Sequence, residues 1–184
     1  MSRPSSPSFS DIGLPDGHAF PELVYHHPTG SIVAHTRPRE SRLPSYRLSI
    51  RTASESRYRV VGDFPPTISI ASFAVCQTRP LLYFVTFSWS ERDGQVGGDW
   101  DALYRFTLDT RKSEVVARRG ELIPPDHYHT AWLTRLHSTA DDGSRVFCTA
   151  ALRIGEGPID YCLCELSVAE RKLATITKLE AVFA

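Results

Sequence analysis

Two polar stretches in the middle of the chain hold the residues best suited to bind a ligand or a metal ion. The first, SERDGQVGGDWD (90–101), is rich in glycine and carboxylates, and the second, RGELIPPDHYHTAW (119–132), carries two imidazoles. Carboxylates bind hard cations such as Ca²⁺ and Mn²⁺, whereas imidazole suits Zn²⁺ and iron. We interpret both stretches as loops. The candidate ligand-binding residues are Asp93, Asp99, Trp100, Asp101, Asp126, His127, His129 and Trp132.

Four of these side chains, Asp99, Asp101, His127 and His129, are candidate ligands of a divalent metal ion. Such an ion can polarise an ester or lactone carbonyl and lower the pKa of a bound water, which is the chemistry of a metal-assisted hydrolase. The competing interpretation is a solvated turn, because Asp and Gly also satisfy turn geometry. Since spacing within loops is a weak metal signal, we expect no cofactor and no catalytic residue.

Hairpins that begin with a tyrosine recur along the chain. They start at Tyr46, Tyr104 and Tyr161, which are 58 and 57 residues apart. Each alternates apolar and polar positions, passes a polar turn and resumes with β-branched residues, the pattern of a half-buried hairpin. Another strand pair precedes each tyrosine, around the turns HPTG, QTRP and ADDG. The sequence therefore predicts an all-β fold of three four-stranded antiparallel meanders.

The meanders divide the chain into repeats at about 21–64, 67–119 and 129–180 within one β domain, 21–184. Residues 1–20 are rich in serine and proline, and we expect them to be disordered because they offer little apolar surface to bury. The alternative fold is a β-sandwich, which also uses short strands with frequent turns. A sandwich does not require the regular spacing of the tyrosines.

Four antiparallel strands repeated at a fixed period are typical of a β-propeller blade. The stretch ADDGSRVFCTAAL, followed by DYCLCELSVAERKLATI, resembles blades of the TolB and prolyl-oligopeptidase type of propeller. There an Asp-Gly turn leads into an apolar strand and then a strand pair opening with Y-x-L-x-x-L. A WD40-like repeat matches less well, because the single Trp-Asp pair, Trp100-Asp101, precedes the third strand. The resemblance implies a six-bladed ring, the fold on which some lactonases are also built.

Three blades leave two blade faces uncovered, since propellers close with about four to eight blades. One hypothesis is a homodimer, in which the last blade of one copy packs on the first blade of the other and closes a six-bladed ring. A protein partner that supplies the missing blades is the alternative. We expect a non-catalytic binding or interaction module that presents loops 90–101 and 119–132. The alternatives are a metal-assisted hydrolase and a structural part of a propeller completed by another chain.

Composition excludes several other classes of function. The 21 basic and 21 acidic residues cancel and form no basic cluster, which argues against a nucleic-acid partner. The most apolar window, TISIASFAV, has nine residues, whereas a membrane-spanning helix needs about 20. No secretory signal is recognisable, so we expect a cytoplasmic protein. The cysteines at 76, 148, 162 and 164 lack metal-site or disulfide spacing, and we interpret them as reduced, buried thiols.

Overall fold

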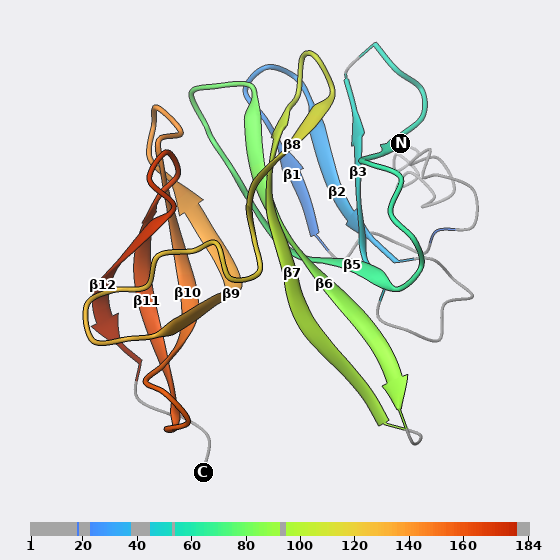
Figure 1. The fold of residues 1–184 in the computed structure, drawn as a ribbon. Coiled ribbons are helices and arrows are strands. Elements are labelled where there is room, and N and C mark those ends of the chain that lie inside the picture. Colours follow the sequence, from blue (N-terminus) through green and yellow to red (C-terminus); the bar gives the residue numbers. More distant parts are fainter. Residues whose placement is uncertain (1–17, 19–22, 38–44, 53, 93–94, 180–184) are drawn as a thin grey trace, which may run out of the picture.

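The computed structural model describes residues 18, 23–37, 45–52, 54–92 and 95–179 (Figure 1). These residues form twelve β-strands and no helix, arranged as three separate four-stranded antiparallel sheets. The predicted all-β fold of three meanders is therefore confirmed, and the two sheets of a sandwich are not formed. No helix in this part of the chain could cross a bilayer. The tail predicted to be disordered, 1–20, lies outside the described residues except for His18.

Each sheet is a meander, with strands that follow one another in the chain lying side by side. The first sheet contains β1 (Leu23–His26), β2 (Ile32–Thr36), β3 (Arg47–Arg51) and β4 (Arg59–Val60). The second contains β5 (Ile68–Val75), β6 (Leu81–Arg92), β7 (Gln95–Thr107) and β8 (Lys112–Arg118). The third contains β9 (Thr130–Thr139), β10 (Arg145–Arg153), β11 (Ile159–Ser167) and β12 (Lys172–Lys178).

Turns at equivalent positions of the second and third sheets share an unusual backbone conformation. Arg111, between β7 and β8, has φ 56°, and Arg171, between β11 and β12, has φ 57°. Non-glycine residues seldom adopt this left-handed region, and one such residue in a short hairpin loop restores the strand twist. In both turns a lysine follows and begins the next strand. The shared geometry supports the repeat that the sequence indicated.

The stretch 90–101 is not the loop that the sequence predicted. It forms the end of β6 and the start of β7, and their ladder continues to the pair Arg92 and Gln95. Glycines 97 and 98 suggested a loop, but they pair with Ser90 and Trp89 in the sheet. A Cβ on Gly98 would lie 2.8 Å from the Trp89 ring, so the glycine makes room for the ring on the neighbouring strand. The resulting hairpin extends beyond the other strands (Figure 1).

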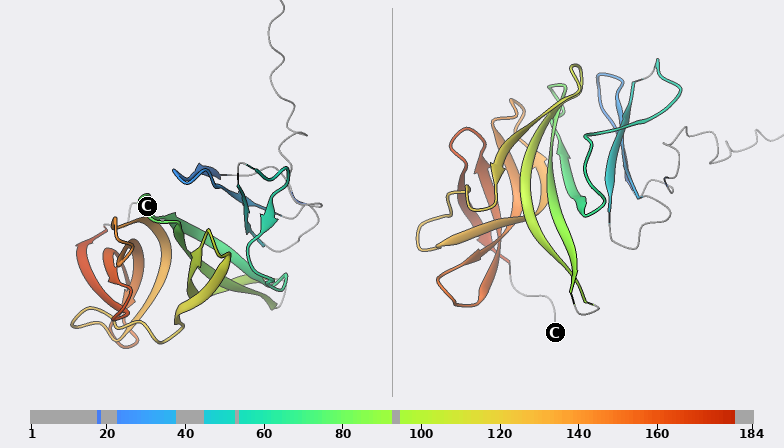
Figure 2. Two further views of the ribbon diagram at one scale, coloured as in Figure 1. Left: turned by 90° about the horizontal axis from the view of Figure 1, so that it is seen from above. Right: turned by 45° about the vertical axis from the view of Figure 1, so that its right-hand side comes forward.

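The three sheets lie side by side in chain order, and the second is buried on both faces (Figure 2). Strand β6 shows the alternation that makes this possible. Its Leu82 and Phe84 join the core with the first sheet, whereas Tyr83 and Val85 join the core with the third. All four are fully buried. A middle sheet that is apolar on both faces is what stacked propeller blades require.

Buried hydrogen bonds fix how neighbouring sheets sit against each other. The Tyr83 hydroxyl donates to the Gly143 carbonyl oxygen at 2.6 Å, across the second and third sheets. Ser72 of β5 donates to the Leu136 carbonyl of β9 at 3.2 Å and accepts the Leu136 N–H at 3.0 Å. On the other side, buried His27 donates through Nε2 to the Cys76 carbonyl at 2.7 Å. These directional contacts add orientation to the non-directional apolar cores.

The two outer flanks of the stack differ in exposure. On the third sheet, Tyr161 alternates with the inward-facing cysteines of β11 and is 48% exposed. On the first sheet, the residues that alternate with the core positions are Ala34, Thr36 and Ser49, and all three are fully buried. Nδ1 of His18 lies 2.8 Å from the Thr36 hydroxyl. Val24 and Val60, which pair with Ala34 and Ser49 on the same face, are 40% and 38% exposed, so both outer flanks expose some apolar side chains.

Candidate functional site

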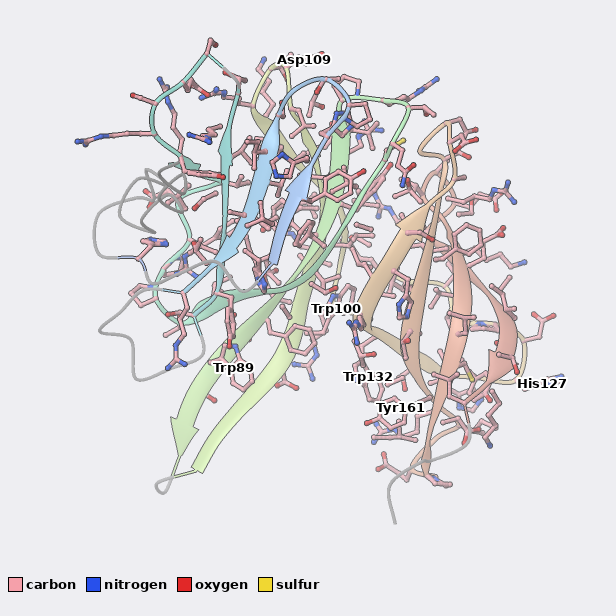
Figure 3. The ribbon with its side chains drawn as sticks, turned by 180° about the vertical axis from the view of Figure 1, so that it is seen from behind. Trp89, Trp100, Asp109, His127, Trp132 and Tyr161 are labelled. Carbon is pink, nitrogen blue, oxygen red and sulfur yellow. The ribbon has the colours of Figure 1, made fainter. Side chains whose placement is uncertain are left out.

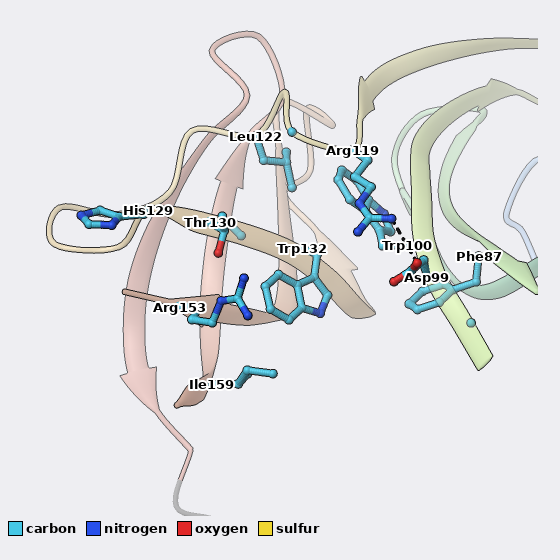
Figure 4. A pocket seen from close by; sticks show the side chains of 13 residues that line it. Phe87, Asp99, Trp100, Arg119, Leu122, His129, Thr130, Trp132, Arg153 and Ile159 are labelled. Carbon is cyan, nitrogen blue, oxygen red and sulfur yellow. Dashed lines mark ion pairs between the residues drawn. The ribbon is translucent and has the colours of Figure 1, made fainter. Parts of the chain in front are cut away.

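A hollow of about 420 Å³ lies between the second and third sheets (Figure 4). Small-molecule pockets commonly measure about 300–1,000 Å³. Its wall comes from four parts of the fold: the β6–β7 hairpin, the connection from β8 to β9, the start of β9, and the β10–β11 turn region. The residues that define it best are Phe87, Trp100, Arg119, Trp132, Arg153 and Ile159. The hollow exists only when the two sheets are stacked.

Aromatic rings make up one side of the hollow. Trp100 is 2% exposed and belongs to the core between the sheets, and half-buried Phe87 and Trp132 pack against that core. A register shift in the β6–β7 ladder pairs Thr86 with Ala102 but Phe87 with Trp100, which leaves Asp101 as the extra residue of a β-bulge. The bulge therefore sets Trp100 directly opposite Phe87 on the face toward the third sheet. Such a wall favours a flat or apolar ligand.

Charged groups lie at the rim and in the wall. Arg119 pairs through Nη1 with Asp99 Oδ2 at 3.1 Å, but both side chains are more than two-thirds exposed, so the pair adds little stability. Arg153, from the end of β10, lies on the other side of the Trp132 indole (Figure 4). It takes part in no ion pair among the described residues.

Two buried donor atoms of the wall have no partner in the described part of the chain: Trp100 Nε1 and Arg153 Nε. An indole N–H and a guanidinium can only donate hydrogen bonds. A buried donor without an acceptor costs about 1–3 kcal/mol. Arg51 Nε and Trp89 Nε1 are also buried without a partner there and do not line the hollow, so unpaired donors are not a distinguishing feature of its wall.

The connection from β8 to β9 is anchored to the third sheet next to the hollow. Tyr128 donates through its hydroxyl to Asp160 Oδ2 at 3.0 Å, and this hydrogen bond raises the pKa of Tyr128 to about 12. Lys178 pairs with the other carboxylate oxygen at 2.7 Å. The Lys178 and Tyr128 hydrogen bonds lower the pKa of Asp160. His129 follows, and its Nδ1 accepts the Gly155 N–H at 3.1 Å, which places the proton of the neutral ring on Nε2.

The structure brings half of the predicted site residues together. Asp99, Trp100, His129 and Trp132 line the hollow, although Trp132 belongs to β9 and not to a loop. Asp101 instead accepts a hydrogen bond from the Thr86 hydroxyl at 3.1 Å. Asp93 lies outside the described residues. Asp126 and His127 are exposed and do not line the hollow, and His127 sits at the far edge of the third sheet from Trp132 (Figure 3).

The four predicted metal ligands do not form a cluster. Among the described residues, no three His, Cys, Asp or Glu side chains are placed to share a metal ion. All four cysteines are buried and free, as the sequence indicated. Burial raises the pKa of Cys148 and, to about 11, that of Cys164, which makes both thiols poor metal ligands and nucleophiles at neutral pH.

Of the six residues that define the hollow best, sequence reasoning missed four: Phe87, Arg119, Arg153 and Ile159. Arg119 is the first residue of the second predicted loop, and this position was the one feature of the sequence that indicated a role in the site. In the sequence, Phe87 cannot be distinguished from an ordinary core residue of an apolar strand. Arg153 comes from a different repeat, and only the stacking of the sheets brings it near Trp132.

No family model matches the chain, and no curated protein matches it. Among solved structures, it is similar to TolB from Acinetobacter baumannii, with 10% identity and a TM-score of 0.30 over 82% of this chain and 41% of TolB. It is also similar to a chain from a structural and mechanistic analysis of two prolyl endopeptidases, with 13% identity and a TM-score of 0.30. That match covers 94% of this chain and 31% of the other. The chain thus spans less than half the length of either protein.

Proposed function

We propose that this propeller-like chain is a non-catalytic binding module whose ligand occupies the hollow between the second and third sheets. The observation that carries the proposal is the composition of the wall. Three aromatic side chains from both sheets surround the space, with guanidinium groups at two places on its wall. Ligand pockets combine mostly apolar walls with a few placed polar groups in this way.

The site differs from the one that the sequence suggested. The stretches 90–101 and 119–132 were expected to present ligand-binding loops, and both contribute to the hollow. Their contribution comes from the strand residues Trp100 and Trp132, together with Asp99 and His129, and not from exposed loop tips. Strand residues hold their side chains in place better than loop residues, which favours a preformed site.

The alternative of a metal-assisted hydrolase has less support. A catalytic metal commonly needs three protein ligands around one open position. Of the four candidates, only Asp99 and His129 line the hollow, and Asp99 already pairs with Arg119. The arrangement therefore favours binding over hydrolysis.

An interaction with another chain is a second candidate function, supported by the open flank of the third sheet. Tyr161 is 48% exposed there, and on the outer face of the first sheet Val24 and Val60 are 40% and 38% exposed. Closure of a ring by two copies would bury apolar side chains of both flanks. Homodimer formation, a protein partner, the cytoplasmic location and the lack of a nucleic-acid partner stay predictions. Light scattering behind a sizing column tests the dimer, which should have about twice the 20.6 kDa mass of the chain.

The binding proposal is tested by nuclear magnetic resonance with a library of small fragments. The three tryptophans give three indole N–H signals in a ¹⁵N-labelled sample. A ligand in the hollow should shift the Trp100 and Trp132 signals more than that of Trp89, which does not line it.

A blocking variant, Thr130→Phe, fills the hollow beside Trp132 (Figure 4) and should abolish these shifts. Ser138→Phe is the matched control, since Ser138 is exposed toward the other end of the same strand. If no fragment shifts the two signals, or if binding survives in Thr130→Phe, the hollow is not the binding site.

A further inference from the structure

The hollow offers a ligand only those polar groups that reach solvent, so the buried donor atoms of its wall do not qualify. The Asp99 carboxylate and the Arg119 guanidinium do, because their side chains are 68% and 69% exposed. Thr130 and His129 are exposed as well and line the same hollow. The chemistry of a ligand can therefore be inferred from these four side chains and from the apolar surface beside them.

Asp99 and Arg119 form the most polar part of this surface. Arg119 Nη1 lies 3.1 Å from Asp99 Oδ2, and no hydrogen bond of the other carboxylate oxygen is found within the described residues. Gly98 precedes Asp99, Gly120 follows Arg119, and both glycines line the hollow. Neither glycine carries a side chain that shields the ion pair, so a ligand can approach it directly.

This ion pair favours a ligand with hydroxyl groups. Its two charges compensate each other, so it attracts neither an anion nor a cation strongly. A carboxylate only accepts hydrogen bonds and a guanidinium only donates them. A ligand beside the pair must therefore donate at one point and accept at the next. A hydroxyl group does both, and two hydroxyls on adjacent carbon atoms match the two side chains together.

Another part of the wall is apolar. Trp132 and Phe87 are half-buried, and Ile159 is 43% exposed. Figure 4 shows the Trp132 indole between Arg119 and Ile159. A ligand here needs an apolar face next to its hydroxyl groups. A pyranose ring has this shape, because its C–H groups form an apolar face that stacks on an indole while its hydroxyls point outward around the ring.

Arg153 is the one feature of the wall that favours an acidic ligand instead. It takes part in no ion pair among the described residues. Its side chain is half-buried, however, and its Nε atom lies inside the wall, away from the hollow. The fully exposed charges are those of Asp99 and Arg119, which cancel. The accessible surface therefore favours a neutral ligand.

We propose that the ligand is a neutral saccharide, whose ring stacks on Trp132 and whose adjacent hydroxyls bind Asp99 and Arg119. This inference rests on the proposed binding function of the hollow. Because hydroxyl pairs and apolar ring faces are common to many sugars, the test uses probes that differ in linkage and ring configuration.

The experiment titrates the whole chain with neutral disaccharides and follows the indole N–H signals. Maltose, cellobiose, lactose and diacetylchitobiose are the saccharide probes. Cyclohexylmethanol, which has an apolar ring and a single hydroxyl, tests the platform alone, and glucuronate tests an acidic sugar. We expect at least one disaccharide to shift the Trp132 signal more than that of Trp89 and to bind at least about 10-fold more tightly than cyclohexylmethanol. Tighter binding of glucuronate than of every neutral sugar would overturn the neutral ligand.

Two variants test the role of the ion pair. Asp99→Ala and Arg119→Ala should each weaken the binding of the best disaccharide about 10-fold, since each removes a hydrogen bond to a charged group. Both side chains are exposed and their pairing adds little stability, so both variants should fold. Glu165→Ala is the matched control, because it breaks the exposed pair of Arg145 and Glu165, which do not line the hollow. It should leave the affinity unchanged. Unchanged affinity in both Asp99→Ala and Arg119→Ala would overturn the assignment of the hydroxyls to this pair.

The outcomes separate this inference from the binding proposal. If fragments shift the Trp100 and Trp132 signals but none of the disaccharides does, the saccharide is wrong while the hollow stays a binding site. If neither the sugars nor any fragment shifts these two signals, both proposals are wrong.

Discussion

Replacing Tyr83 by phenylalanine tests whether one buried hydrogen bond helps to hold the second and third sheets together. The hydroxyl donates to the Gly143 carbonyl at 2.6 Å, and both residues are buried. Phenylalanine keeps the shape of the ring but leaves the carbonyl without this donor, which costs about 1–3 kcal/mol. We expect a loss of about 2 kcal/mol. For a chain of this length that corresponds to a melting temperature lower by roughly 4–8 °C.

The assay is thermal and urea unfolding followed by circular dichroism, with Tyr104→Phe as the matched control. Tyr104 lies on the adjacent strand, and its ring stacks on Phe84 with centroids 5.0 Å apart. No hydrogen bond of its hydroxyl is found within the described residues, so its loss should change stability by less than about 0.5 kcal/mol. Burial raises the pKa of Tyr83, so its hydroxyl stays protonated throughout neutral pH. If the two variants lose equal stability, the bond between the sheets contributes nothing measurable.

Three further changes probe other parts of the fold. The Arg111 hydrogen bond holds the pKa of Glu55 at about 2, below the ordinary 4.5, so its stabilising effect is complete above pH 4.5 and is lost as the pH falls toward 2. The stability difference between the wild type and Glu55→Gln in urea should therefore shrink from pH 6 to pH 2.5, and a constant difference would contradict this. Cys148 and Cys164 should react with a thiol reagent at pH 8 only after denaturation, because burial raises the pKa of both; rapid labelling of the folded chain would refute this burial. Gly143→Ala should lower the free energy of unfolding by about 1–2 kcal/mol because φ is 70° there, and an unchanged urea midpoint would count against strain.

The strand pattern of this chain could be predicted because it is local. Alternating apolar positions after Tyr104 and Tyr161, and turns such as ADDG, belong to the same short segments that they describe. The strands of all three sheets fall within the predicted repeat ranges. Gly97 and Gly98 misled the prediction, because both lie in a strand, and Gly98 makes room for the ring of Trp89 on the neighbouring strand. A glycine that accommodates a cross-strand ring and a glycine in a turn look the same in one sequence.

The candidate site was harder to predict, because its parts come from different repeats. The sequence suggested that Trp100 and Trp132 belong to polar loops. In the structure they face the same hollow from two different sheets. Nothing near Arg153 in the sequence indicates that its Nε is buried or unpaired. The predicted metal ligands failed to converge for the same reason: Asp99 lines the hollow, whereas His127 sits at the far edge of the third sheet from Trp132 (Figure 3).

Exposed apolar residues on both outer flanks of the stack affect how copies of this chain can associate. Filaments require two different adhesive surfaces on each copy, so that every added copy leaves one free for the next. Tyr161 is exposed on the third-sheet flank, and Val24 and Val60 are 40% and 38% exposed on the first-sheet flank. A contact between the third-sheet flank of one copy and the first-sheet flank of the next leaves one flank free at each end. Unless such a contact closes a ring, concentrated solutions of the folded chain should therefore form assemblies larger than a pair.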